Sequence, residues 1–179
     1  MRRKCSAFVI LLVVLIALVG CGPGETQQPA SGGTAEIAPT QPAEMTPEAL
    51  GQQIGAVYVE SIAEVTKLVA DRPAAAEVKP KIEEMKESYI QRLVELGWKR
   101  EALGDADKAI VDGEIRSALD AFYRDEAQWN AFNEAAQYYA AEDFEVNQLL
   151  VSFNVIGQYA NFDLLKEQEP EEAERLGIE

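Results

Sequence analysis

The sequence predicts an all-α fold: a single helical-bundle-like domain of about five helices over residues 46–179, behind a signal peptide and a flexible linker. Two observations predict the domain. Apolar residues recur every three or four positions through most of this range, which places them on one side of a helix. No stretch alternates apolar and polar residues as a half-buried strand does. This length suffices for one domain with its own core.

The first helix is predicted to begin at Thr46, whose hydroxyl can cap it, with Pro47 at the first helical position. Apolar residues then follow at helical spacing up to a stop at Asp71-Arg72-Pro73.

A second helix is expected from Pro73 or Ala74 to Leu96, with Pro80 as a kink or as a delayed start. Gly97 is expected to end it as a left-handed cap.

Two further helices are predicted after Gly104. Asp105 can cap the third helix, and the fourth extends from about Glu126 to Ala141. Gly113 is a weak point inside the third helix, costing about 1 kcal/mol relative to alanine. The expected apolar sides are Ile110, Ile115, Leu119, Phe122 and Tyr123 on the third helix, and Trp129, Phe132, Ala136 and Tyr139 on the fourth.

A fifth helix, from about Asp143 to Tyr159, is apolar around most of its circumference. A helix of this kind is normally buried, so it is predicted to be the central helix of the domain. Its apolar stripe comprises Val146, Leu149, Leu150, Phe153, Ile156 and Ala160, with Val151 and Val155 on the far side. One or two short turns, 164–167 and 170–176, complete the domain.

Residues 1–20 have the layout of an export signal. Arg2, Arg3 and Lys4 precede the apolar run Ala7–Val19, and a small residue, Gly20, stands at the expected cleavage point. The run is shorter than the ~20 residues that cross the hydrocarbon of a bilayer. An ordinary secretory signal and an uncleaved membrane helix are the alternative interpretations.

Leu18-Val19-Gly20-Cys21 resembles the lipobox of bacterial lipoproteins. In that family the signal is cut before the cysteine, whose thiol carries a diacylglyceryl group and whose new amino group is usually acylated. The resemblance implies that Cys21 is lipidated and anchors the chain stably to a membrane. In Gram-negative members an aspartate after the cysteine favours inner-membrane retention. Gly22 at this position therefore favours the outer membrane, facing the periplasm, in a Gram-negative host, and otherwise the outer face of the cell membrane.

Residues 21–45 are predicted to be the lipidated cysteine followed by a disordered linker rich in Gly, Pro, Thr, Gln and Ser. Such a linker has a root-mean-square reach of ~27 Å. The chain after Cys21 contains 13 basic and 31 acidic residues, a formal charge of −18. This charge disfavours nucleic acid and anionic lipid head groups as partners. It either keeps the tethered domain soluble or attracts cationic partners.

The sequence contains no histidine. This excludes c-type haem attachment, the Glu-x-x-His di-iron site and a Ser-His-Asp triad. There is no phosphate-binding Gly-x-x-x-x-Gly-Lys-Ser loop, and the acidic residues from Asp105 onward lack the ligand spacing of an EF-hand. We therefore expect no metal site, no cofactor beyond the covalent lipid on Cys21, and no enzymatic activity.

Three asparagines, Asn147, Asn154 and Asn161, recur at seven-residue intervals along the predicted fifth helix. They either fix the register of the helices by hydrogen bonding or line a binding groove. In the second interpretation they form a candidate site together with the amphipathic side chains of Tyr138, Tyr139 and Tyr159.

These observations favour a membrane-anchored envelope lipoprotein whose helical domain binds a protein partner or the cell wall without catalysis. The alternatives are a small-molecule or cation-binding module that uses the Tyr/Asn groove, and a pilot lipoprotein that assembles an outer-membrane complex. The least favoured alternative is a cell-wall hydrolase, because Glu60-Ser61 and Glu87-Ser88 resemble the Glu-Ser of lytic transglycosylases but the other motifs are missing.

Overall fold

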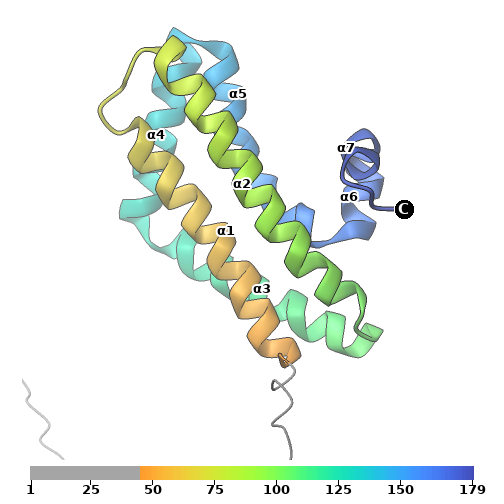
Figure 1. The fold of residues 1–179 in the computed structure, drawn as a ribbon. Coiled ribbons are helices and arrows are strands. Elements are labelled where there is room, and N and C mark those ends of the chain that lie inside the picture. The colour runs from red at the N-terminus through yellow and green to blue at the C-terminus, as the bar shows by residue number, and fades with distance from the viewer. Residues whose placement is uncertain (1–44) are drawn as a thin grey trace, which may run out of the picture. The chain divides into compact units, whose positions relative to one another are not determined.

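The computed structural model describes residues 45–179, and every regular element in this range is a helix (Figure 1). The all-α prediction is therefore confirmed for the domain. The predicted signal peptide, Cys21 and the linker up to residue 44 lie outside the described residues. The elements are α1 (Pro47–Val69), α2 (Ala75–Glu101), α3 (Asp105–Arg124), α4 (Glu126–Glu142), α5 (Phe144–Ser152), the 3-10 helix η1 (Phe153–Ala160), α6 (Phe162–Gln168) and α7 (Pro170–Arg175).

α1 is the central helix of the domain. It contacts α2, α3, α4 and η1, and it lies antiparallel to the long helix α2 (Figure 1). The side chains of Ile54, Ile62 and Val65 are completely buried in these contacts. The predicted start is confirmed, because the Ala49 N–H donates to the Thr46 hydroxyl at 3.3 Å. None of the helices in residues 45–179 is long and apolar enough to cross a bilayer.

Two glycines bring the backbones of α1 and α3 into close contact. A Cβ atom added at Gly51 would lie 2.6 Å from the Val111 carbonyl oxygen, and one added at Gly55 would lie 2.6 Å from the Ala118 Cβ. Real Cβ atoms do not approach other atoms this closely, so only glycine fits at either position. The spacing of the two glycines, one helical turn apart, thus serves packing within the chain.

α2 differs from its prediction at both ends. It begins at Ala75, so Pro80 lies inside the helix and the delayed start is wrong. It continues past Leu96 to Glu101, so Gly97 is an interior residue and not a left-handed cap. The reason is packing: a Cβ at Gly97 would lie 2.5 Å from the Phe162 ring.

α3 is only partly covered by its neighbours. Gly104 is its N-cap residue and Asp105 its first helical residue, so the predicted Asp105 cap is wrong. Val111 and Phe122 are the buried residues of α3, while the expected core residues Ile110 and Tyr123 are exposed. Its contact with α1 is therefore narrower than its apolar side.

The predicted fifth helix is two elements, and it is not central. The α-helix ends at Ser152 and continues as the 3-10 helix η1, which has three residues per turn. The apolar stripe predicted for this helix is buried, including Val146, Leu150 and Phe153, except that Leu149 is only partly buried. Val151 and Val155 are 42 % and 52 % exposed, which leaves the outer side of α5 and η1 uncovered. The short C-terminal turns are confirmed as α6 and α7.

Replacing Gly55 by alanine tests the α1–α3 contact. The added methyl group overpacks against Ala118, which should reduce the free energy of unfolding by about 1–3 kcal/mol. Gly113→Ala is the matched control, because a Cβ there meets nothing within 4 Å. It should stabilise the domain by about 0.5–1 kcal/mol. Urea denaturation measures both changes, and a Gly55→Ala domain as stable as the wild type would contradict the close contact.

Candidate functional site

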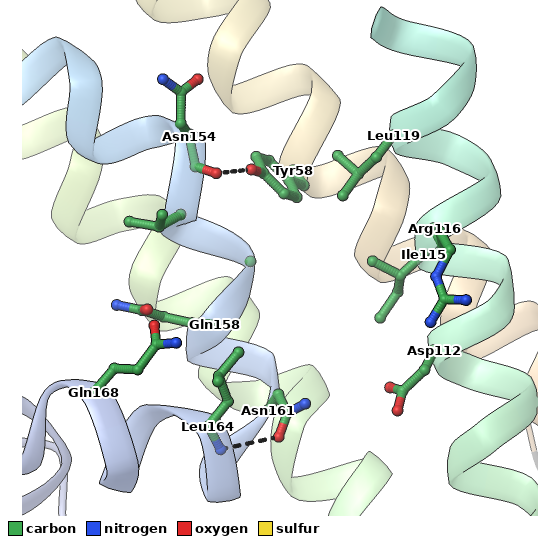
Figure 2. A pocket seen from close by; sticks show the side chains of 12 residues that line it. Tyr58, Asp112, Ile115, Arg116, Leu119, Asn154, Gln158, Asn161, Leu164 and Gln168 are labelled. Atoms are coloured by element: carbon green, nitrogen blue, oxygen red, sulfur yellow. Dashed lines mark hydrogen bonds between the residues drawn. The ribbon is translucent and has the colours of Figure 1, made fainter.

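A groove lies between α3 and η1, with α6 at one end and Tyr58 of α1 at its base (Figure 2). We call it the α3–η1 groove. Its cavity volume is about 480 Å³, within the range of small-molecule sites. Twelve residues line it: Tyr58, Asp112, Ile115, Arg116, Leu119, Asn154, Val155, Gly157, Gln158, Asn161, Leu164 and Gln168.

The walls of the groove are largely apolar. Ile115 and Leu119 lie one turn apart on α3, in the part of its apolar side that α1 leaves uncovered. Val155 and Leu164 face the cavity from η1 and α6. The groove therefore forms where the apolar side of α3 extends beyond its contact with α1.

The three-residue period of η1 decides which of its side chains reach the groove. Phe153, Ile156 and Tyr159 are three positions apart and buried in the core. Val155 and Gln158 share a second side, which lines the groove, and on the third side the Asn154 backbone carbonyl and Gly157 contact Tyr58.

Tyr58 joins α1 to η1 at the base of the groove. Its buried hydroxyl donates to the backbone carbonyl of Asn154 (Figure 2). Burial raises the pKa of Tyr58 well above its ordinary value, so the phenol remains protonated and keeps its donor. A Cβ at Gly157 would lie 2.8 Å from the Tyr58 ring, so this glycine lets η1 approach the ring.

Gln158 is one of the polar residues of the groove whose side chain has no hydrogen-bond partner in residues 45–179. The residue is only 7 % exposed, and its carboxamide forms no hydrogen bond with the other lining residues (Figure 2). Asn161, by contrast, is committed to the fold: its side-chain oxygen accepts from the Leu164 N–H at 3.2 Å and caps α6. The Asn154 side chain points away from Tyr58, and its buried Oδ1 has no partner.

An ion-pair cluster neutralises the carboxylate on the α3 wall. The buried Arg100 guanidinium donates to both oxygens of Asp112, at 3.0 and 2.9 Å. Arg100 also pairs with Glu101, which in turn pairs with Lys108. Arg116, one turn after Asp112, forms no ion pair with any carboxylate of residues 45–179. The groove thus carries one uncompensated positive charge.

The structure does not bring the six predicted binding residues into one groove. Asn154 and Asn161 line the α3–η1 groove, but Tyr138, Tyr139, Asn147 and Tyr159 do not. The Tyr139 hydroxyl donates to the Pro73 carbonyl at 2.7 Å, and the Asn147 side chain donates to the Ala136 carbonyl at 2.8 Å.

Tyr138 and Tyr159 lie elsewhere in the fold. The Tyr138 ring packs edge-on against Tyr139 and lies under Arg72. Tyr159 is buried, and burial raises its pKa to about 12. The seven-residue spacing of the asparagines fails as a guide because a 3-10 helix turns 120° per residue instead of 100°, and Asn161 lies beyond its end.

Sequence reasoning missed Tyr58, Arg116, Gln158 and Gln168 as groove residues. Tyr58 had the spacing of a core residue, and Arg116 that of a solvated face. The sequence of α3 did contain one signal of the groove. Its apolar side, which includes Ile115 and Leu119 on either side of Arg116, is wider than packing against a single helix requires.

A second exposed feature adjoins the groove. Phe144 and Val151 lie seven positions apart on α5 and Val155 follows on η1, and these apolar residues are 70 %, 42 % and 52 % exposed. We call these three residues the apolar strip. Beside Phe144 lies a hollow of about 430 Å³, to which α2 contributes Lys79, Glu83 and Lys86.

The two carboxylates considered for hydrolysis are both held by arginines. Glu60 accepts from Arg92 at 3.2 and 3.0 Å and from the Tyr89 hydroxyl at 3.2 Å. Glu87 accepts from Arg175 at 3.3 and 3.1 Å. The hydrogen bonds from Arg92 lower the pKa of Glu60, whereas a general acid needs a raised one. This geometry suits structural ion pairs. Within residues 45–179 no three potential ligands from His, Cys, Asp and Glu are grouped for a metal ion.

Comparison with protein-family models, with curated proteins and with solved structures gives no match for this chain. Function is therefore inferred from the residues and their geometry.

The pKa of Glu60 tests whether this carboxylate is a structural ion-pair partner or a catalytic acid. Because Arg92 stabilises the charged carboxylate, NMR titration should place this pKa below the ordinary glutamate value, and Arg92→Gln should return it toward that value. The stability from this pair is present at neutral pH and is lost as the pH falls through the lowered pKa. A pKa raised toward neutrality would instead support a catalytic acid.

Proposed function

We propose that the chain is a lipid-anchored envelope protein whose helical domain acts without catalysis, by holding a partner protein on the apolar strip. The observation that carries the proposal is the exposure of Phe144, Val151 and Val155 on α5 and η1. The lipobox-like residues ending at Cys21 and the linker after them support the tethered location.

The strip has the properties of a docking surface. A helix that is apolar around most of its circumference is normally buried, yet the outer side of α5 and η1 has no cover in this domain. Three large apolar side chains are exposed within residues 144–155, and exposed apolar surface is characteristic of interaction sites. The hollow beside Phe144 provides a recess for an anchoring side chain of the partner.

The charge of the domain limits the chemistry of that partner. Residues 45–179 contain 13 basic and 28 acidic side chains. A second copy of the domain or an anionic lipid surface would be repelled, whereas a partner with an apolar centre and a basic rim would be attracted. A pilot lipoprotein that escorts an outer-membrane component is one form of this function.

Lipidation of Cys21 is tested by mass spectrometry of the protein purified from its host membrane. The N-terminal peptide should begin at Cys21 and carry the mass of two or three acyl chains. Cys21→Ser should abolish this mass, whereas Cys5→Ser, which alters the other cysteine within the signal, should leave it unchanged. An unmodified N terminus elsewhere in the wild-type chain would remove the membrane anchor from the proposal.

The docking surface is tested by photo-crosslinking in intact cells from position 148. Gln148 is exposed and lies beside Phe144. We expect one discrete protein adduct, which the double substitution Phe144→Ser, Val151→Ser should abolish.

Ile110→Ser is the matched control, because it removes an exposed apolar side chain outside the strip. It should retain the adduct, and all variants should keep their stability within about 0.5 kcal/mol. No discrete adduct, or equal loss in the control, would argue against docking on the strip.

A further inference from the structure

We propose that the α3–η1 groove binds an anionic amphiphile, an apolar chain that ends in a carboxylate, with Arg116 and Gln158 at its head and Leu119 along its body. This ligand site goes beyond the protein partner proposed for the apolar strip, and does not depend on it.

The shape and lining of the groove fit the apolar part of such a ligand. The cavity of about 480 Å³ is open to solvent along one side and is bounded by Ile115 and Leu119 from α3 and by Leu164 from α6 (Figure 2). Sites for small molecules combine apolar walls of this kind with a few polar groups that fix the orientation of the ligand.

Gln158 is a polar group of that kind. Its residue is 93 % buried, and its carboxamide forms no hydrogen bond to the residues around the groove (Figure 2). The carboxamide is not among the fully enclosed polar atoms without a partner, so solvent or a ligand in the groove can reach it. The amide N–H groups of Gln158 suit a carboxylate oxygen as acceptor.

Arg116 determines the sign of the ligand charge. It faces the groove from the opposite wall to Gln158 (Figure 2). The neighbouring carboxylate, Asp112, is already bound through both oxygens by Arg100. Other acidic residues of α3 are also engaged, Glu114 with Gln52 and Asp120 with Arg124. The Arg116 guanidinium is therefore available to a carboxylate from outside the chain, with which it can form a charge-assisted hydrogen bond.

The charge of the groove and the overall charge of the domain predict ligands of opposite charge, which makes the proposal testable. The overall excess of acidic residues favours a cationic amphiphile, whereas Arg116 favours an anionic one. Three ligands with the same ten-carbon chain separate these effects: decanoate, decanol and decyltrimethylammonium. Calorimetric titration uses the whole chain with Cys21→Ser and the signal removed, so that no detergent is needed and each ligand stays below its micelle concentration.

We expect decanoate to bind at least about tenfold more tightly than decyltrimethylammonium. Of the three ligands, only decanoate has a carboxylate with which the Arg116 guanidinium can form an ion pair. Arg116→Gln should weaken decanoate about tenfold and leave decanol unchanged, and Gln158→Leu should also weaken decanoate. Lys67→Gln is the matched control, because it removes an exposed positive charge outside the groove, and it should change nothing. Leu119→Asn should weaken all three ligands.

Tighter binding of the cationic ligand, or decanoate binding that Arg116→Gln leaves intact, would overturn the proposal. Absence of decanoate binding by a folded domain would do the same. Arg116 is exposed, so its substitution leaves the core intact and the result does not depend on refolding. None of these outcomes bears on the crosslinking test of the apolar strip, which uses different residues and a protein partner.

Discussion

The close contact between α1 and α3 is the constraint on which the rest of the domain depends. Gly51 and Gly55 lack the side chains that would hold the helices apart, so α3 packs directly on the backbone of α1. The contact does not cover the whole apolar side of α3. Ile115 and Leu119 extend beyond it and remain partly uncovered, and they form one wall of the α3–η1 groove. The packing that stabilises the bundle therefore also opens its cavity.

Local signals predicted the helices well because they act over a few residues. The Thr46 cap and the stop before Pro73 depend on hydrogen bonds and backbone geometry within one turn, and both appear in the structure. Gly97 shows where such signals fail. A glycine after an apolar helical stretch is typical of a cap, but here its missing side chain makes room for Phe162, which lies far along the chain. No local pattern contains that neighbour.

Charge behaves differently at the scale of the domain and at the scale of the groove. The composition correctly describes an acidic molecule, but it does not locate the individual pairs. The buried Arg100 binds Asp112 through two hydrogen bonds, and this pairing leaves Arg116 without an opposite charge beside it. Arg100 and Asp112 come from different helices, so their pairing depends on how the helices pack. The net charge of the domain therefore restricts the charge of its protein partner, while the Arg100–Asp112 ion pair determines the charge of the groove.

The candidate site could not be read from the sequence mainly because the helical period changes at Phe153. Seven-residue spacing keeps three asparagines on one side of an α-helix, where each residue turns by 100°. In η1 each residue turns by 120°, so positions three apart share a side. Phe153, Ile156 and Tyr159 then enter the core, and Gln158 turns toward the groove beside Val155.

Both periods are compatible with the apolar pattern of this stretch, because the core positions 153 and 156 are three apart in either case. The Tyr58 hydroxyl donates to the Asn154 carbonyl in the 3-10 helix η1, and Gly157 of the same helix contacts the Tyr58 ring. Both involve α1, a helix at the other end of the domain sequence. The position of Gln158 in the groove wall is thus a consequence of tertiary packing, which explains why its neighbours in the sequence gave no sign of it.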